Sequence, residues 1–211
     1  KIMAYFPFFM DISNKNVLIA GGGETALRKA DILLSFGANI TVVAPYICRN
    51  ILENEKITKI NRPFNTGDIY GAFMVIAATN NSQINKQISE ICFKNKIPVN
   101  VVDDIELCSF IFPSIVKDKD IVCAISSGGK SPSATQYVKK ILKSSLPPYL
   151  GDINSRVGDL RNTVKSFIPC RKKREEIFRN IFELLIKTEN KATKRDIELI
   201  IEKAVDKNEK N

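Results

Sequence analysis

The sequence predicts an α/β fold, in which a Rossmann-type parallel sheet is followed by a small α+β segment and a helical C-terminal region. Over residues 1–113, short runs rich in Val and Ile alternate with helical patterns, as in sheets covered by helices on both faces. A glycine-rich turn follows the first of these runs. Residues 149–211 carry apolar side chains at helical spacing on a charged background. The predicted division is therefore 1–113, 114–148 and 149–211.

The most informative stretch begins with an apolar strand over residues 17–20. Gly21, Gly23 and Ala26 follow it at the G-x-G-x-x-G/A spacing, and an amphipathic helix covers 27–34. At this spacing the first residue permits a tight turn, the second lets the backbone approach a pyrophosphate, and the third lets the helix pack on the strand. The free N–H groups at the helix start attract the pyrophosphate. The pattern predicts a dinucleotide site, with a purely structural turn as the alternative.

Four further apolar runs predict the remaining strands of this sheet, and a helix is predicted over residues 82–94. The strand runs are residues 40–44, 57–60, 73–78 and 98–102. In parallel sheets, ligands bind at the carboxyl ends of the strands. Besides the glycine turn, the residues expected around this crevice are Pro45, Tyr46, Thr79, Asn80, Asp103 and Asp104.

A different unit is predicted after residue 113. Apolar runs over 114–116 and 121–125 flank a polar turn, which indicates a hairpin. A Ser-Ser-Gly-Gly-Lys-Ser loop over 126–131 then leads into a helix, with Ser131 as its N-cap and a proline at its first position. The glycines, hydroxyls and Lys130 of this loop could cradle a carboxylate or phosphate. An ordinary capped turn is the alternative.

The C-terminal region is predicted to be helical. One apolar stripe holds Val157, Leu160, Val164 and Phe167, and a second holds Ile177, Ile181, Leu184 and Leu185. A last helix is expected to start at Thr193, because the spacing from Thr193 to Asp196 resembles a capping box. These stripes are most simply core or interface faces.

Asp103 and Asp104 are the candidate catalytic carboxylates. The chain has no histidine, so proton chemistry falls to carboxylates, Lys, Tyr or Cys. A carboxylate at the end of a strand can accept a proton beside a hydride transfer, whereas a turn or cap role is the alternative. Successive side chains of an extended segment point to opposite faces, so only one of the two is expected to face the pocket. No metal site is predicted, because the five cysteines form no C-x-x-C pair.

Positive charge is concentrated in the second half of the chain. Residues 1–113 hold 11 basic and 10 acidic residues, whereas residues 114–211 hold 21 and 13. This excess indicates either a solvated lysine-rich surface or a face that binds anions such as polycarboxylates. Nucleic acid is not predicted as a partner, because no recognition motif accompanies the charge.

No membrane association is predicted, since no apolar run approaches the roughly 20 residues of a membrane-spanning helix. The apolar first ten residues are broken by Pro7 and lack a signal-peptide cleavage pattern. We interpret them as a lead-in to the first strand of a cytoplasmic protein. The acidic residue that often reads a ribose 2′-hydroxyl would fall near residues 43–46, where none is present. The residues alone therefore do not separate NAD from NADP.

Six motifs occur in order along the chain: residues 21–29, 37–45, 76–85, 99–103, 109–113 and 126–132. Together they resemble the precorrin-2 dehydrogenase family, the dehydrogenase and ferrochelatase module of siroheme synthase. The resemblance implies NAD-dependent oxidation of precorrin-2 to sirohydrochlorin, with insertion of ferrous iron in bifunctional relatives. It also implies a homodimer formed by the segment 114–148, which is then the dimerisation segment. The helical C-terminus would help to enclose the tetrapyrrole polycarboxylate.

The resemblance assigns the catalytic role to Asp103. The predicted substrate-binding residues are Asn100, Ser127, Gly128 and Lys130, and the resemblance places at Ser127 a serine that is phosphorylated in some relatives. The predicted cofactor-binding residues are Gly21, Gly23, Glu24, Thr25, Pro45, Tyr46 and Thr79. The alternative function is an NAD-binding regulatory module without turnover. That alternative leaves Asp103 and the loop 126–131 unexplained.

Overall fold

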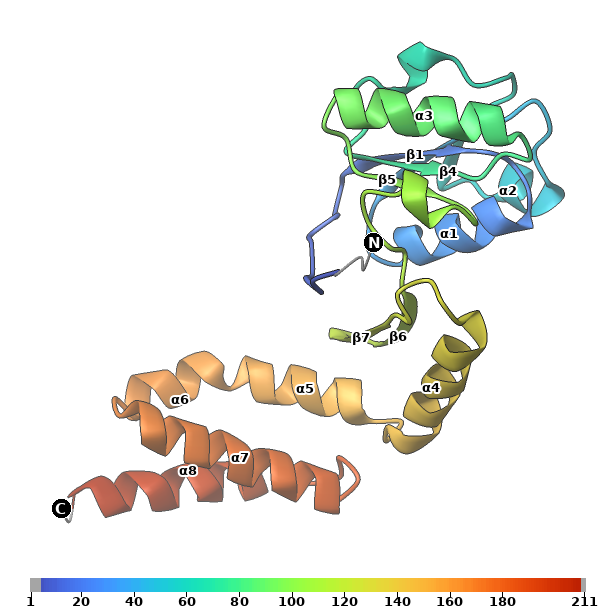
Figure 1. Cartoon of the computed structure of the whole chain (residues 1–211). Coiled ribbons are helices and arrows are strands. Elements are labelled where there is room, and N and C mark those ends of the chain that lie inside the picture. The colour runs from blue at the N-terminus through green and yellow to red at the C-terminus, as the bar shows by residue number, and fades with distance from the viewer. Residues whose placement is uncertain (1–4, 210–211) are drawn as a thin grey trace. The chain divides into compact units, whose positions relative to one another are not determined.

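A computed structural model describes residues 5–209, and the chain divides into two compact units (Figure 1). The first unit is the chain up to Phe112 together with Gly128–Lys130. The second is Pro113–Ser127 and the chain from Ser131 onward. Apart from residues 128–130, the predicted segments 114–148 and 149–211 thus fall into a single unit.

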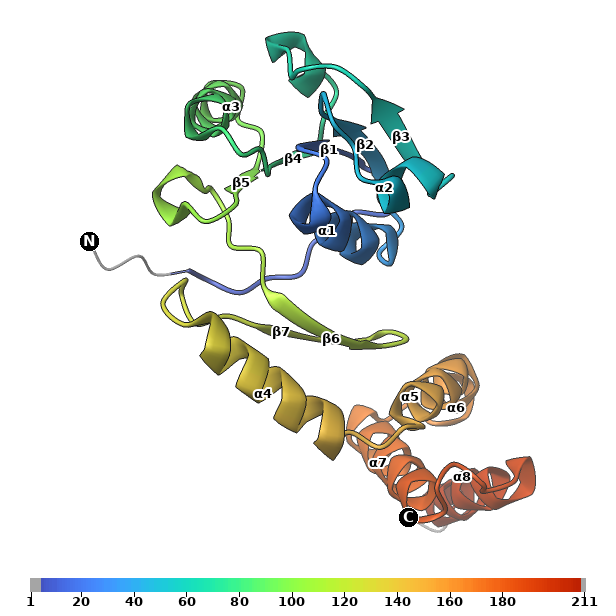
Figure 2. The same ribbon diagram turned by 90° about the vertical axis from the view of Figure 1, so that its right-hand side faces the viewer.

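The first unit is built on a five-stranded parallel sheet, as predicted. Its strand order is β3-β2-β1-β4-β5, and Figure 2 shows β3 and β5 at its opposite edges. The strands are β1 (Asn16–Ala20), β2 (Asn39–Val43), β3 (Ile57–Ile60), β4 (Met74–Ala77) and β5 (Val99–Val101). The chain leaves β1 on one side for β2 and returns on the other for β4. Such a reversal of strand order opens a ligand crevice at the carboxyl ends of the central strands.

Helices cover both faces of this sheet, with α3 (Ser82–Lys94) on one face and α1 (Glu24–Leu34) on the other (Figure 1). Alternate residues of β1 belong to the two cores: Val17 and Ile19 pack with buried residues of α1, and Leu18 packs with those of α3. The short helix α2 (Arg49–Glu53) lies on the α1 side through Ile51. The α1 helix begins at residue 24, three residues before the predicted start.

Three short elements complete the first unit. They are the 3-10 helices η1 (Thr66–Ile69) and η2 (Ile105–Leu107), and an irregular lead-in that leaves Phe6, Phe8 and Phe9 exposed. Residues 1–4 of the predicted lead-in lie outside the described residues.

The second unit opens with the predicted hairpin, in which β6 (Ser114–Asp118) pairs antiparallel with β7 (Ile121–Ile125). The first strand is two residues longer than predicted, so the turn shrinks to Lys119 and Asp120. Lys119 adopts φ +51°, which a two-residue hairpin turn demands. The helix α4 (Pro132–Ser145) follows, and the Ser131 Oγ accepts the Ala134 N–H at 3.1 Å, which confirms the predicted N-cap.

Four helices follow α4: α5 (Leu150–Asp159), α6 (Arg161–Phe167), α7 (Arg171–Lys187) and α8 (Lys194–Glu209). Their core contains the predicted stripe of Ile177, Ile181 and Leu185. The predicted stripe through Phe167 is wrong at its last position, because Phe167 is 62% exposed while Ile168 is fully buried. A break at Leu160 separates α5 from α6 and ends the continuous helical periodicity on which that stripe was based.

The predicted capping box at the start of α8 is confirmed. The Thr193 N–H donates to Asp196 Oδ2 at 2.7 Å, and the Asp196 N–H donates to Thr193 Oγ1 at 3.2 Å. The Thr193 hydroxyl also donates to Asp196 Oδ2 at 2.7 Å, and this bond together with the one from the Thr193 N–H holds the pKa of Asp196 below its ordinary value. Among the described residues, no helix is both long and apolar enough to cross a bilayer.

Arg156 ties α5 to the loop between α7 and α8. Its guanidinium donates to the Asn190 carbonyl oxygen at 2.8 Å, to Asn190 Oδ1 at 2.6 Å and to the Ala192 carbonyl oxygen at 2.8 Å. We expect Arg156→Ala to lower the free energy of unfolding by about 2–3 kcal/mol, because the half-buried acceptors lose charged donors. Urea denaturation followed by circular dichroism measures this change. Arg179→Ala, at an exposed position of α7, is the control and should stay within about 0.5 kcal/mol of the parent chain.

Candidate functional site

The parallel register brings the predicted crevice residues of the first unit to one edge of the sheet. The Gly21 N–H donates to the Val43 carbonyl at 2.9 Å, which joins the ends of β1 and β2. The Ala78 N–H donates to the Ala20 carbonyl at 2.7 Å, and the Val102 N–H donates to the Ala77 carbonyl at 2.9 Å. The chain ends of β1, β2, β4 and β5 therefore lie side by side, and each is followed by a predicted site residue.

The three consecutive glycines after β1 meet different surroundings. Gly21 has φ +125°, and a Cβ there would lie 2.2 Å from the Ala78 carbonyl oxygen. A Cβ on Gly22 would lie 2.2 Å from the Tyr46 carbonyl oxygen. A Cβ on Gly23 would meet no atom within 4 Å. The first two glycines thus permit close backbone packing, whereas Gly23 borders open space.

The start of α1 offers free hydrogen-bond donors next to that space. Gly23 is the N-cap residue, and among the described residues no side chain caps this helix. The N–H groups of the first helical turn have no partner within the helix, and the helix dipole adds positive potential there. Glu24 is exposed, and Thr25 is half-buried with its hydroxyl accepting from Arg28 Nη2 at 3.1 Å. The first turn of α1 is therefore uncapped, and the space beside Gly23 is open. Both features suit the binding of a dinucleotide pyrophosphate.

Pro45, Tyr46 and Thr79 border the same turn. Pro45 and Tyr46 are exposed, Tyr46 by 89%, and the backbone of Tyr46 packs against Gly22. The Thr79 hydroxyl donates to Asn85 Oδ1 at 2.7 Å, and Asn85 Nδ2 donates to the Thr79 carbonyl at 3.0 Å. Asn85 is only 8% exposed, so this buried amide fixes the chain after β4. Sequence reasoning gave Asn85 no role beyond its place in a motif.

Asp103 stands at the end of β5 in an unusual backbone conformation, with φ +61°. Both it and Asp104 are exposed, and Asp104 precedes η2 without making a side-chain cap. The expectation that the two carboxylates point to opposite faces of an extended segment is wrong in its premise, because a left-handed residue interrupts the extended chain. Asp tolerates this conformation better than most residues, so the turn role and the functional role both remain compatible with the geometry.

Asn100 was predicted to bind substrate, but its amide is engaged inside the first unit. Asn100 is 7% exposed, its Oδ1 accepts from Lys29 Nζ at 3.2 Å, and its Nδ2 donates to the Phe110 carbonyl at 3.2 Å and to Cys108 Sγ at 3.4 Å. A buried amide with both ends satisfied holds its neighbours in place. In the structure Asn100 thus accepts a hydrogen bond from Lys29, and its predicted contact with the substrate stays a prediction.

Lys29 is the residue of this region that sequence reasoning missed. Its ammonium lies 4.0 Å from the centre of the Phe112 ring, in a cation–π contact. Burial lowers the pKa of Lys29 to about 8, while the charges of Cys108 and Asp103 oppose that shift and Arg28 adds to it. A signal was present in the sequence: Lys29 lies three residues after the buried Ala26 and four before the buried Leu33, on the inner side of the helix.

The sequence allows the loop 126–131 to be an anion cradle or an ordinary capped turn. In the structure it forms a capped turn. The Ser131 N–H donates to Ser127 Oγ at 3.0 Å, so the Ser127 hydroxyl helps to close the turn. Gly128 and Gly129 have φ +64° and +79°. Gly129 packs against Ile105 of the first unit, two residues beyond Asp103, and Lys130 is exposed. Ser127 belongs to the second unit.

Two other features lie outside the predicted site. Within residues 5–209, no group of three or more Cys, Asp or Glu side chains is placed to hold a metal ion.

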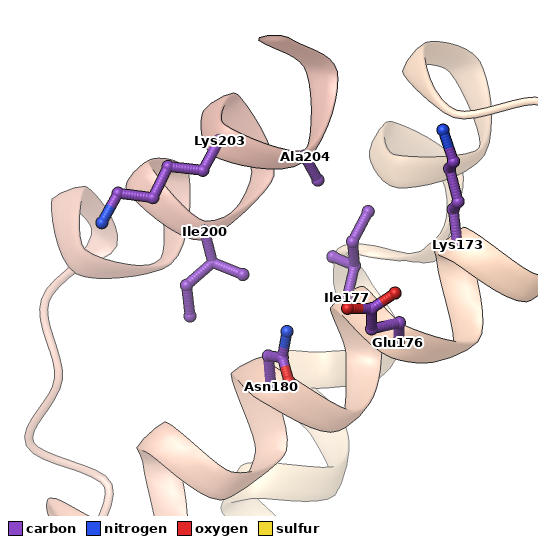
Figure 3. A pocket seen from close by; sticks show the side chains of 7 residues that line it. All are labelled: Lys173, Glu176, Ile177, Asn180, Ile200, Lys203 and Ala204. Carbon is purple, nitrogen blue, oxygen red and sulfur yellow. The ribbon is translucent and has the colours of Figure 1, made fainter. Parts of the chain in front are cut away.

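In the second unit, side chains of α7 and α8 line an open groove, shown in Figure 3. Its lining residues are Lys173, Glu176, Ile177, Asn180, Ile200, Lys203 and Ala204.

Residues 8–114 match the model of a protein family described as putative NAD(P)-binding. The chain belongs to this NAD(P)-binding family. The matched range covers the whole parallel sheet and ends at the first residue of β6. The glycine turn and the uncapped start of α1 both lie within this range. The family description, putative NAD(P)-binding, names the dinucleotide class that the glycine turn predicts.

The NAD(P)-binding chain is also similar to named proteins. It is 41% identical over 186 residues to a siroheme synthase of Vesicomyosocius okutanii, covering 85% of this chain and 40% of the relative. It is 42% identical over 170 residues to a siroheme synthase of Nitrosospira multiformis, covering 77% of this chain and 36% of the relative. The chain therefore spans well under half the length of these relatives. The matches agree with the resemblance seen in the sequence.

The fold is that of a solved structure titled SirC, precorrin-2 dehydrogenase. The two share a TM-score of 0.73 at 22% sequence identity, over 95% of this chain and 98% of the other. This similarity confirms the predicted fold class, a parallel sheet followed by a small antiparallel sheet and a helical C-terminal region.

Proposed function

We propose that this chain catalyses the NAD-dependent oxidation of precorrin-2 to sirohydrochlorin. The observation that carries the proposal is the arrangement at the carboxyl edge of the sheet. The uncapped start of α1 follows β1, and β4 and β5 are the next two strands of the sheet. Asp103 stands at the end of β5. The names of the siroheme synthase relatives and of the SirC structure support it. Because the chain spans 36–40% of those two relatives, it corresponds to one part of them.

The residues of the chain divide the work of this reaction. The bound dinucleotide would supply a hydride acceptor. Gly23 leaves room for its pyrophosphate, and the N–H groups of Glu24 and Thr25 bind and orient it. Asp103 accepts the proton that must leave the substrate with the hydride, because an exposed carboxylate at the strand end is a base in reach of solvent. Lys130, exposed beside Gly129, offers a positive charge to a carboxylate of the polyanionic substrate.

The proposal specifies NAD on the strength of the family resemblance, since the end of β2 carries no carboxylate to select it. Residues 43–46 read Val-Ala-Pro-Tyr. Without a carboxylate here, no acidic side chain accepts a hydrogen bond from the ribose 2′-hydroxyl of NAD. No negative charge repels the 2′-phosphate of NADP either. We therefore expect NADP to be accepted as well, with a smaller preference for NAD than an acidic residue at this position would give.

The decisive experiment is anaerobic incubation of the chain with precorrin-2 and NAD, with NADH and sirohydrochlorin measured together. Equal amounts of both products support the proposal. Binding of NAD without any NADH from folded protein would instead favour the regulatory module. Parallel reactions with NADP measure the cofactor preference.

Iron insertion is tested by extending the same reaction. The resemblance implies that ferrous iron can be a substrate, inserted into sirohydrochlorin to give siroheme. Ferrous ion is added to the product with and without the chain, and the absorbance of siroheme is followed. A rate equal to the rate without protein would make the chain a dehydrogenase only.

A homodimer in the cytoplasm completes the proposal. Of the described residues of α4 none is buried, and Tyr137, Val138 and Ile141 are 68%, 40% and 44% exposed. An apolar helix face of this kind is typical of an interface. Sedimentation equilibrium measures the mass. We expect a dimer, and the change Ile141→Glu, which places a charge in the apolar face, should shift the equilibrium to monomer.

A further inference from the structure

The thiol of Cys108 contacts the backbone on both sides of Asp103. Its Sγ donates to the Val101 carbonyl oxygen at 3.2 Å and to the Asp104 carbonyl oxygen at 3.1 Å, and these two acceptors share its one proton. The Val101 N–H donates back to the same sulfur at 3.1 Å. Asp103 lies between Val101 and Asp104 in the chain. One side chain therefore brackets the turn that carries the candidate base.

The backbone around Cys108 is itself anchored on both sides. Before it, the Leu107 carbonyl oxygen accepts from Ser89 Oγ of α3 at 2.7 Å. After it, the Ser109 N–H donates to the Val99 carbonyl oxygen at 2.9 Å, and the Val99 N–H donates to Ser109 Oγ at 2.8 Å. Because β5 is the edge strand, these bonds occupy the side of β5 that faces away from β4. The thiol thus extends from a segment that is fixed to β5 and to α3.

The turn at Asp103 requires support of this kind. Its φ of +61° lies in the left-handed region, and a non-glycine residue stays there only where the surroundings determine its conformation. Asp103 and Asp104 are both exposed, and Asp104 makes no side-chain cap for η2. The Cys108 thiol supplies an interaction on each side of the left-handed residue.

The Cys108 thiol is also in the protonation state that these contacts need. Burial raises the pKa of this thiol above its ordinary value, so the sulfur keeps its proton at neutral pH and remains a donor to the two carbonyl oxygens. A cysteine that served only as a small apolar residue would need no polar partners. The contacts with Val101 and Asp104 therefore favour a role in fixing the turn.

We propose that Cys108 is a positioning residue for Asp103: its thiol, hydrogen-bonded to Val101 and Asp104, holds the left-handed turn and so fixes where the Asp103 carboxylate stands. Cys108 acts through the backbone and touches neither cofactor nor substrate. The thiol contacts rest on the structure alone, whereas their effect on the rate rests on the proposed function.

The contacts are tested without any substrate, by hydrogen exchange of the Val101 amide in the full chain measured by NMR. This amide donates to the Cys108 sulfur, so we expect it to be protected in the parent chain. In Cys108→Ala it should exchange about tenfold faster or more, because its acceptor is gone. Cys170→Ala, at an exposed cysteine of the second unit, is the control and should leave the exchange unchanged. An unchanged rate in Cys108→Ala would overturn the proposal, whether or not the chain oxidises precorrin-2.

The effect on the rate is tested with the same variants. Cys108→Ala should lower kcat by about tenfold or more with unchanged NAD affinity and unchanged KM for precorrin-2, because only the position of the base is disturbed. Cys108→Ser should restore part of kcat, since a hydroxyl donates and accepts as a thiol does, although its shorter C–O bond reaches less far. Cys170→Ala should keep the kcat of the parent chain. The parent kcat in Cys108→Ala would overturn the positioning role.

A double-mutant cycle separates positioning from a general loss of structure. If Cys108 acts through Asp103, Cys108→Ala should cause no further loss of kcat in the Asp103→Asn background. An equal loss in both backgrounds would instead overturn the proposal. If Cys108→Ala does not fold, Cys108→Ser takes its place in the cycle. If the parent chain gives no turnover while Cys108→Ala speeds the exchange at Val101, the proposed function fails and the thiol contacts stand.

Discussion

Asp103→Asn is expected to remove most of the dehydrogenase activity while leaving the fold and the binding of NAD unchanged. Asn keeps the size of the side chain and tolerates the left-handed conformation at φ +61° as well as Asp does. What it loses is the negative charge and the ability to accept a proton. General-base groups contribute about 10²–10⁴-fold, so kcat should fall by that order. Stopped-flow detection of NADH under anaerobic conditions measures kcat, and fluorescence titration measures NAD binding.

Two controls separate this role from the turn role of Asp103. Asp104→Asn changes the neighbouring exposed carboxylate, which caps nothing, and should leave kcat unchanged. Asp103→Gly should fold at least as stably as the parent chain, because glycine adopts positive φ without strain, yet it should be as inactive as Asp103→Asn. Full activity in Asp103→Asn would show that the aspartate serves only the turn. Loss of activity in Asp104→Asn alone would move the role to that residue.

The parallel sheet could be predicted from the sequence because its strands are buried on both faces. Val17–Ala20 and the run around Val75 have no polar residue to accommodate, so they read as continuous apolar segments. The start of α1 was placed three residues late because Glu24 and Thr25 look like part of the glycine turn. In the structure these two residues already belong to the helix, and Gly23 is its N-cap residue.

The hydrogen bonds of Asn100 could not be predicted, since they include a contact between distant parts of the chain. The bond from Lys29 to Asn100 joins residues 71 positions apart, and no local pattern encodes it. Asn100 carries a polar side chain in an apolar strand, which equally suits a ligand contact or an internal hydrogen bond. In the structure the amide is hydrogen-bonded to Lys29, Cys108 and the Phe110 carbonyl, and no local pattern in the sequence indicates these partners.

Alanine is expected to destabilise the chain strongly at Gly21 and Gly22, and only slightly at Gly23. Gly22→Ala would place a Cβ 2.2 Å from the Tyr46 carbonyl oxygen and 2.8 Å from the Ile47 Cα, both of them backbone atoms. Gly21→Ala adds the strain of φ +125° to a 2.2 Å approach to the Ala78 carbonyl oxygen. Each should cost about 3 kcal/mol or more, because the β1 turn and its neighbours must move apart. Urea denaturation measures the loss.

Gly23→Ala is the matched variant, since a Cβ there meets no atom within 4 Å. Its stability should fall by no more than about 1 kcal/mol, the cost of a poorer N-cap residue. Its NAD affinity, however, should fall by about tenfold or more, because the methyl group fills the space through which a pyrophosphate reaches the first turn of α1. Calorimetric titration with NAD at a temperature where the variant is folded measures that affinity. Unchanged NAD binding in Gly23→Ala would place the pyrophosphate elsewhere, and a stable Gly22→Ala would contradict the tight packing of the turn against Tyr46.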